Sequence, residues 1–134
     1  MAAWLAVGKD VAVVSHESAL DLLGLSDVIP DAVHLTVPRS KRHLPLLPGA
    51  MIHTTSRKLR PGDRIVRDGV SLTSAARTIL DATEAGTAPE QIEMAVVQAI
   101  ERGLVTKQQL LKDAAERSQR VTKLIADALR KAEQ

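Results

Sequence analysis

Four histidines are the side chains of this sequence that could most readily bind a metal or transfer a proton near neutral pH. His34 and His53 fall in two segments with strand character and could be neighbours on adjacent strands. A metal site would need a third ligand at a recognisable spacing, and the sequence offers none. We therefore interpret both as imidazoles on the polar surface of a sheet, and we expect no metal and no cofactor.

Ser15 and His16 stand at the start of a segment with helical character. Ser15 could be a nucleophile by residue type, but a serine in this position is far more often an N-cap, whose hydroxyl accepts from the first helical turn. We expect Ser15 to cap a helix over residues 16–23, with the Glu17 carboxylate favoured by the helix dipole. His16 is then a surface residue of the first turn.

Several catalytic patterns are missing from the chain. The seven glycines never stand two apart, so the dinucleotide and P-loop phosphate cradles are absent. No two aspartates stand two apart, no acid stands two residues before a lysine, and there is no Gly-x-Ser-x-Gly elbow. We expect no catalytic residues and a non-enzymatic protein, with a nuclease-like accessory enzyme as the alternative.

Arg77 and Asp81 are spaced so that they share one face of a helix. One interpretation is a local ion pair that stabilises the helix by a few tenths of a kcal/mol. The other is that Arg77 reaches a neighbouring element and, with Thr73 and Asp81, organises a structural junction. The sequence leaves both open.

Positive charge is concentrated in one part of the chain. Residues 39–67 contain eight Lys and Arg against the single acid Asp63, although the net charge of the whole chain is only +2. These cations could sit in solvated loops, or they could neutralise phosphates and give weak, non-specific DNA binding. The candidate phosphate-binding residues are Arg39, Lys41, Arg42, Arg57, Lys58 and Arg60.

The elements that position these side chains belong to one domain over residues 1–134. The composition, 45% hydrophobic and 25% charged, is that of an ordinary globular protein. There is no cysteine and no apolar run that could span a bilayer, so we expect a cytoplasmic protein without a membrane partner. Phe and Tyr are absent and Trp4 is the only residue among Phe, Tyr and Trp. This composition argues against the aromatic stacking platforms that single-strand binders use.

The first half of the chain predicts an α+β fold with a sheet of about four short strands. Asp68-Gly69 is a strong signal for a type I′ hairpin turn. We expect Thr73 to end the last strand and cap the following helix. Strand character falls on residues 33–37, 51–55, 65–67 and 70–72, the first with a clean alternation of apolar and polar residues.

The second half predicts packed helices almost to the end. Pro89 suits a first helical turn, and Thr106 with Gln109 has the spacing of a capping box that opens a helix through about Arg117. These helices could also serve self-association, so an interaction or oligomerisation module is a further alternative. Helical character falls on residues 2–7, 75–82, 89–102, 107–117 and 121–129.

Three stretches of the sequence, taken in order, carry a family resemblance. The first stretch is Val13-Val14-Ser15-His16-Glu17-Ser18-Ala19-Leu20-Asp21-Leu22-Leu23-Gly24-Leu25, the second is Val33-His34-Leu35-Thr36-Val37-Pro38-Arg39, and the third is Gly69-Val70-Ser71-Leu72-Thr73-Ser74-Ala75-Ala76-Arg77-Thr78-Ile79-Leu80-Asp81. Together they resemble the AbiEi family of antitoxins from type IV toxin–antitoxin, or abortive infection, systems. The similarity runs from about Trp4 to Leu111.

The resemblance implies an antitoxin that opposes a nucleotidyltransferase toxin without forming a stable complex with it. It also implies an N-terminal winged helix that binds the operon's own promoter, followed by a larger domain needed for neutralisation. This chain starts where the second domain starts, so we expect antitoxin and regulatory roles without specific operator binding.

Overall fold

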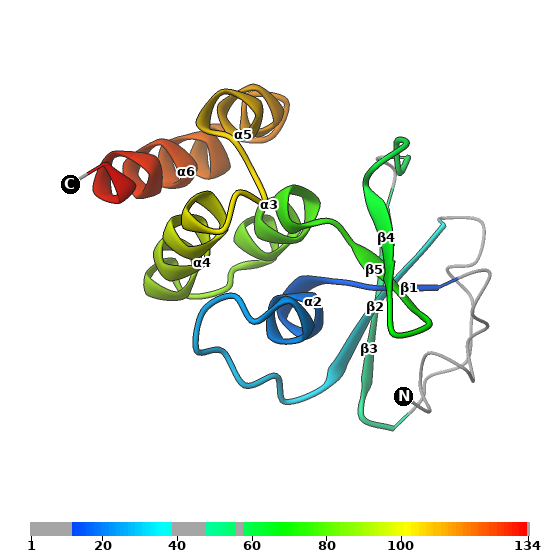
Figure 1. Cartoon of the computed structure of the whole chain (residues 1–134). Helices are drawn as coiled ribbons and strands as arrows, with labels where there is room; N and C mark the ends of the chain where they lie inside the picture. Colours follow the sequence, from blue (N-terminus) through cyan, green and yellow to red (C-terminus); the bar gives the residue numbers. More distant parts are fainter. Residues whose placement is uncertain (1–11, 39–47, 56–57, 134) are drawn as a thin grey trace.

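A five-stranded mixed sheet and a set of helices beside it make up the described part of the chain (Figure 1). The computed structural model describes residues 12–38, 48–55 and 58–133. This arrangement confirms the predicted α+β class and the helical C-terminal half. The elements are β1 (Val13–Val14), α2 (His16–Leu23), β2 (Val33–Pro38), β3 (Ala50–Thr55), β4 (Arg64–Arg67), β5 (Val70–Thr73), α3 (Ala75–Ala85), α4 (Pro89–Glu101), α5 (Lys107–Ala114) and α6 (Gln119–Ala132).

The strand order is β3-β2-β1-β5-β4, with β1 in the centre. β1 runs antiparallel to β2 and parallel to β5, and β2 runs parallel to β3. The sequence predicts about four strands because β1 is only two residues long and shows no alternation. The central position of β1 matters for the site, because its end carries Ser15 and His16 directly into the helix α2.

Strand β2 lies inside the sheet between β1 and β3. The predicted alternation of buried and exposed residues along it is wrong, since the four consecutive residues from His34 to Val37 are all buried. A strand with neighbours on both sides can bury polar side chains when other elements satisfy them. Here the buried Thr36 hydroxyl donates to the Ser15 hydroxyl across 2.7 Å.

The β4–β5 hairpin has the predicted turn. Asp68 and Gly69 both have positive φ, 52° and 79°, and Arg67 pairs with Val70 across the turn. Positive φ at both central residues is the mark of a type I′ turn, whose twist matches that of the flanking strands. The hairpin leads directly into α3, as the sequence predicts.

The N-cap of α3 is Ser74, not Thr73. The Ser74 hydroxyl accepts from the backbone N–H of Arg77, whereas Thr73 is the last residue of β5. The Thr73 side chain is fully buried and its hydroxyl lies 2.6 Å from the hydroxyl of Thr78. Both residue types can cap a helix, and the one-residue difference in strand length decides which of them does.

Replacing Ser74 by Ala is expected to lower the free energy of unfolding by about 1 kcal/mol, the usual effect of removing an N-cap hydroxyl. Urea denaturation measures this change. Gly at the same position is the control, because glycine is an acceptable N-cap and should cost only a few tenths of a kcal/mol. Equal losses for the two variants would contradict the capping role.

Helix α2 begins and ends where the sequence predicts. Gly24 has a φ of 68° and the backbone N–H of Leu25 donates to the carbonyl of Leu20, as in a Schellman ending. Ser15 occupies the N-cap position, but its side chain makes no capping hydrogen bond. The Ser15 hydroxyl is instead directed to His16 and Thr36, so this part of the prediction is wrong.

The helices α4, α5 and α6 form an outer layer beside α3 (Figure 1). Pro89 opens α4 and Thr106 caps α5, as predicted. The capping box is half-formed, because the Gln109 amide donates to Asp113. α5 ends at Ala114, earlier than predicted, and Ser118 caps α6. The predicted helix over residues 2–7 lies outside the described residues.

No helix within the described ranges is long and apolar enough to cross a membrane.

Candidate functional site

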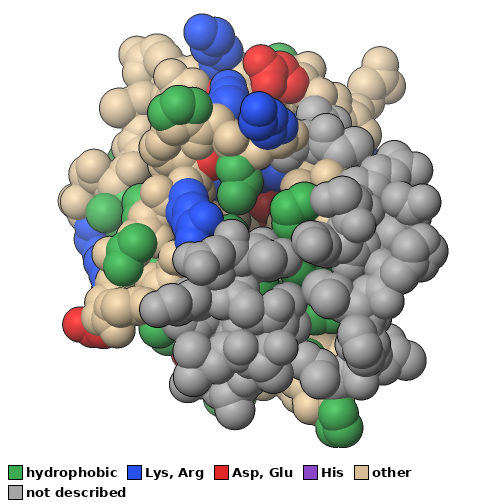
Figure 2. Space-filling view, turned by 90° about the vertical axis from the view of Figure 1, so that its right-hand side faces the viewer, with side chains coloured by type: hydrophobic (Ala, Val, Ile, Leu, Met, Phe, Trp, Pro, Cys, Tyr) green, Lys and Arg blue, Asp and Glu red, His purple; other side chains and the backbone are tan. Residues whose placement is uncertain are grey.

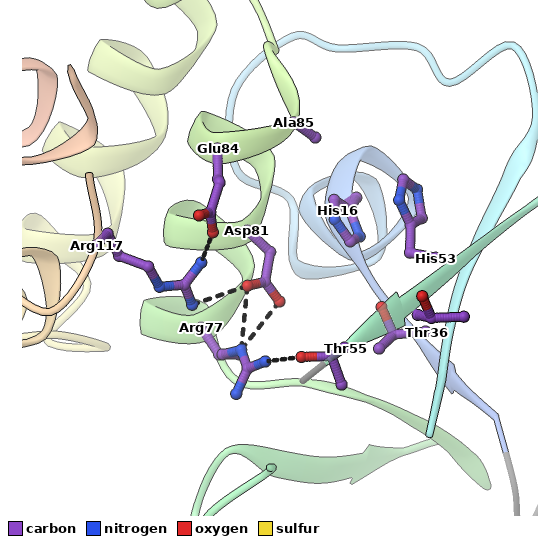
Figure 3. Close-up of a pocket in the computed structure, with 10 residues that line it drawn as sticks. His16, Thr36, His53, Thr55, Arg77, Asp81, Glu84, Ala85 and Arg117 are labelled. Atoms are coloured by element: carbon purple, nitrogen blue, oxygen red, sulfur yellow. Dashed lines mark hydrogen bonds and ion pairs between the residues drawn. The ribbon is translucent and has the colours of Figure 1, made fainter. Parts of the chain in front are cut away.

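A polar cleft of about 280 Å³ opens between the end of β3, the start of α2 and one side of α3 (Figure 3). α3 contributes a row of charged side chains, β2 and β3 contribute threonines, and Arg117 enters from the turn between α5 and α6. The residues that line the cleft are His16, Thr36, His53, Thr54, Thr55, Arg77, Asp81, Glu84, Ala85 and Arg117.

Four charged side chains, Arg77, Asp81, Glu84 and Arg117, form one wall of the cleft. Arg77 lies at the centre of this charged wall. Its side chain is only 6% exposed, and its Nε lies 3.1 Å from both carboxylate oxygens of Asp81. One terminal nitrogen donates to the Thr55 hydroxyl at the end of β3, across 3.2 Å. Both interpretations of the spacing therefore apply: the local ion pair exists, and Arg77 also ties α3 to the sheet.

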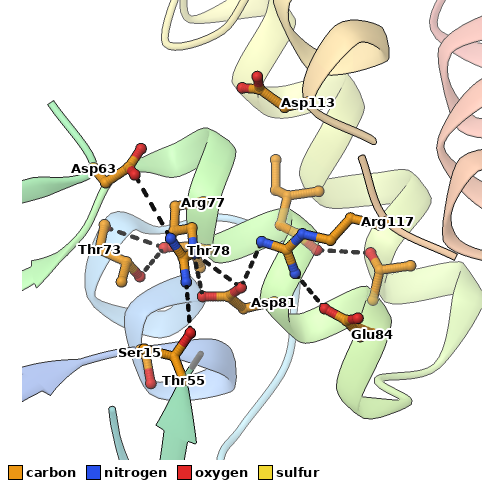
Figure 4. Close-up of polar contacts among 12 residues, drawn as sticks. Ser15, Thr55, Asp63, Thr73, Arg77, Thr78, Asp81, Glu84, Asp113 and Arg117 are labelled. Atoms are coloured by element: carbon orange, nitrogen blue, oxygen red, sulfur yellow. Dashed lines mark hydrogen bonds and ion pairs between the residues drawn. The ribbon is translucent and has the colours of Figure 1, made fainter. Parts of the chain in front are cut away.

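Arg117 completes this wall from a distant part of the chain (Figure 4). Its side chain is 5% exposed and donates to Asp81 across 2.9 Å and to Glu84. The Asp81 carboxylate is thus shared between two guanidinium groups. A short sequence pattern cannot show this contact, because 36 residues separate its partners.

Asp63 and Asp113 hold the loop before β4 against the helices. Asp63 lies 3.6 Å from Arg77 and accepts from the backbone of Arg60. The Arg60 side chain lies 3.5 Å from each of the carboxylates of Asp63 and Asp113, which raise the pKa of this guanidinium above its ordinary value. A second cleft of about 230 Å³ lies on this side of Arg77 and Arg117.

Three histidines stack on one another, and two of them, His16 and His53, line the cleft. The rings of His16 and His53 are 3.7 Å apart and nearly parallel, and His34 lies 5.2 Å from His53. His34 Nδ1 and His53 Nε2 share a hydrogen bond of 2.9 Å. The expectation that His34 and His53 are neighbours is confirmed, but His34 is buried rather than a surface residue.

His16 is also buried, with 8% of its surface exposed, so its predicted surface position is wrong. Its φ of 55° is in the left-handed region, which non-glycine residues seldom adopt. In this conformation the imidazole stacks on His53 of β3. Strained backbone of this kind concentrates at functional sites.

The His16 Nδ1 atom lies 2.7 Å from the Ser15 hydroxyl, which in turn accepts from the Thr36 hydroxyl. Burial, followed by the neighbouring His53 and His34, lowers the pKa of His16 from 6.5 to about 3. Burial likewise lowers the pKa values of His34 and His53.

The hydrogen bond between His34 Nδ1 and His53 Nε2 occupies one nitrogen of each of these rings. Across residues 12–38, 48–55 and 58–133, no group of three or more suitable side chains could hold a metal ion.

The structure brings together only part of the predicted site. Arg77 and Asp81 line the cleft, whereas Thr73 lies at the end of β5 within the junction. Of the phosphate-binding candidates, Lys58 is exposed and Arg60 is held between two aspartates. The candidates Arg39, Lys41, Arg42 and Arg57 lie outside the described residues.

Further basic side chains lie on exposed strand β4. Arg64 and Arg67 of this edge strand are exposed, and Val66 beside them is 67% exposed. Figure 2 shows Lys and Arg side chains gathered in the upper part of the face opposite the helices. This distribution agrees with the concentration of positive charge in residues 39–67.

Sequence reasoning missed the cleft residues His16, Thr55 and Arg117. The signal for His16 was its place directly after a short apolar run, where a strand passes into a helix. For Arg117 no local signal existed. No protein-family model matches this chain, and a search of curated proteins finds no match either.

Proposed function

We propose that this chain is an AbiEi-like antitoxin domain that opposes a nucleotidyltransferase toxin without catalysis and without a stable complex. The supporting observation is that the three stretches that resemble this family, far apart in sequence, meet around one cleft. The first provides His16, the second provides Thr36, and the third provides Arg77 and Asp81.

The convergence includes direct contacts between the stretches. Ser15 and His16 of the first stretch form a hydrogen-bonded chain with Thr36 of the second. Arg77 of the third stretch reaches the end of β3, whose His53 stacks on His16. A shared set of residues that builds one site is what a common function would require.

The state of the polar groups favours a non-catalytic role. A general base works best when its pKa is near the operating pH, and the pKa of about 3 makes His16 a weak base at neutral pH. Ser15 is fully buried, so its hydroxyl cannot reach a substrate in this conformation. Arg77 and Asp81 are engaged with each other, which suits a rigid recognition surface.

Growth rescue tests this proposal. Co-expression of the chain with its cognate nucleotidyltransferase should restore growth, because the family's second domain is the part needed for neutralisation. Gel filtration of the two purified proteins should show separate peaks, as expected without a stable complex. Undiminished killing with soluble, folded antitoxin present would contradict the proposal.

We also propose a cytoplasmic protein that binds duplex DNA weakly and without preference for its own promoter. Phosphate contacts set affinity, whereas base edges must be read by a positioned element in a groove. The basic segment 39–60 could supply the phosphate contacts. We assign no element of the chain to the reading of base edges.

Salt titration measures the phosphate contacts. If about four phosphates are neutralised, a plot of log affinity against log salt should have a slope near −3.6. Replacing Arg39, Lys41 and Arg42 together by Ala should flatten this slope. Lys131→Ala is the control and should change it little, because Lys131 lies outside the basic segment and pairs with Glu93. Tight promoter-selective binding, or no binding at low salt, would contradict the account.

A further inference from the structure

We infer that the cleft beside the histidine stack binds an uncharged nucleobase, carried either by a free nucleoside or by single-stranded nucleic acid. The inference rests on the shape, charge and hydrogen-bonding groups of the cleft, and it does not depend on the proposed antitoxin role.

The charged side chains that line the cleft balance one another. Two guanidinium groups, Arg77 and Arg117, face two carboxylates, Asp81 and Glu84, and each pairs with a partner in the same wall. These four side chains together carry no net charge. An isolated phosphate or ammonium group would have to displace an existing ion pair, so a neutral ligand fits this wall better.

The imidazoles offer uncharged hydrogen-bonding groups to the cleft. His16 uses Nδ1 toward Ser15 and His53 uses Nε2 toward His34, and within the described residues the other nitrogen of each ring makes no hydrogen bond. That nitrogen of a neutral imidazole can donate or accept, according to the tautomer. The hydroxyl of the exposed Thr54 adds a group that can donate or accept. Such a neutral set matches the amide and amine edge of a base.

Two imidazole rings line part of the cleft. The rings of His16 and His53 are nearly parallel, 3.7 Å apart, so each covers one face of the other. Histidine is one of the side chains on which unpaired bases stack. His53 is half-buried whereas His16 is buried, so we expect a base to stack on His53.

The volume of the cleft and its position beside a second hollow agree with a nucleobase as the ligand. The cleft of about 280 Å³ is at the small end for ligand sites, which suits a single base rather than a large cofactor. A neighbouring cleft of about 270 Å³ shares His16, His53 and Ala85 with it. The stacked pair therefore stands between two hollows, so that a base in the first could continue into a sugar or a second nucleotide.

Imidazole signals in nuclear magnetic resonance spectra provide the test, since the sequence has only four histidines. Titration with adenosine, guanosine, cytidine and uridine should shift the His16 and His53 signals saturably for at least one nucleoside. His53→Ala should weaken that binding at least about fivefold, the low end for loss of one base–ring contact. Lys131→Ala, on the outer surface of α6, is the control and should leave the affinity unchanged.

A second variant keeps the test decisive if His53→Ala is unstable. Thr54→Val changes one exposed hydroxyl and should weaken binding without affecting the fold. A single-stranded oligonucleotide that binds tighter than its nucleoside would identify nucleic acid as the source of the base, and equal affinities would identify the free nucleoside. The absence of any saturable shift up to the solubility limit would overturn the inference, and so would the same shift with inorganic phosphate alone.

Discussion

Lowering the pH from 7 to about 4 should cost the protein several kcal/mol of unfolding free energy. The pKa of His16 is about 3 in the folded protein and 6.5 for an ordinary histidine. Between these values the unfolded chain binds a proton that the folded protein does not, so stability falls as the pH falls through this window. At about 1.4 kcal/mol per pKa unit, His16 alone accounts for about 3 kcal/mol near pH 4.

The neighbouring His34 and His53 also lower the stability of the folded protein as the pH falls. Burial lowers the pKa values of His34 and His53, so each also favours the unfolded chain as it gains a proton below pH 6.5. A proton on His16 would place a positive charge near Arg77 and Arg117, both of which lower the pKa of His16. The predicted loss should therefore be steep.

Urea denaturation at a series of pH values measures this loss. His16→Asn is the matched variant, because a side-chain amide can donate to or accept from the Ser15 hydroxyl in place of Nδ1, and asparagine tolerates positive φ. Its stability should vary much less between pH 6.5 and 4 than that of the wild type. Parallel curves for the two proteins would show that His16 is not the source of the acid sensitivity.

Arg77→Leu should have the second large effect, a loss of about 3 to 5 kcal/mol. Removing one partner of a buried ion pair leaves the other as an uncompensated buried charge. Here the substitution removes contacts to Asp81, Thr55 and Asp63, which join α3 to β3 and to the loop before β4. The free energy of unfolding from urea titration at pH 7 gives the value.

Two further variants test whether the loss comes from the buried ion pair. Arg130→Ala removes an exposed ion pair with Asp127 on α6 and should change stability by less than about 1 kcal/mol. Adding Asp81→Asn to Arg77→Leu should restore part of the loss, because it removes the unpaired charge. A loss below about 1 kcal/mol for Arg77→Leu alone would mean that the pair is only a local contact.

The sequence carries most of the fold because its signals are local. Asp68-Gly69 and Pro89 each determine a turn or a helix start from their own backbone preferences, and both predictions are confirmed. A prediction fails where a strand that is one residue longer or shorter changes which residue caps the next helix. Ser74 replaces Thr73 as the cap because β5 extends one residue further.

The candidate site was less predictable, because contacts across the fold build it. The pair Arg77 and Asp81 can be read from helical spacing, but Arg117 reaches Asp81 from another part of the chain. His16 looks like a surface residue of a first helical turn. Only its left-handed backbone and the neighbouring strand β3 bring it beside His53.

The central claim is that the cleft carries the function of this chain, and growth rescue by cleft variants tests it most directly. Wild type, His53→Ala and Lys131→Ala would each be co-expressed with the cognate nucleotidyltransferase, at equal soluble levels and with matching circular dichroism spectra. His53 lines the cleft, whereas Lys131 pairs with Glu93 on the outer helices. We expect wild type and Lys131→Ala to restore growth and His53→Ala to fail. Full rescue by folded His53→Ala, alongside rescue by wild type, would contradict the claim.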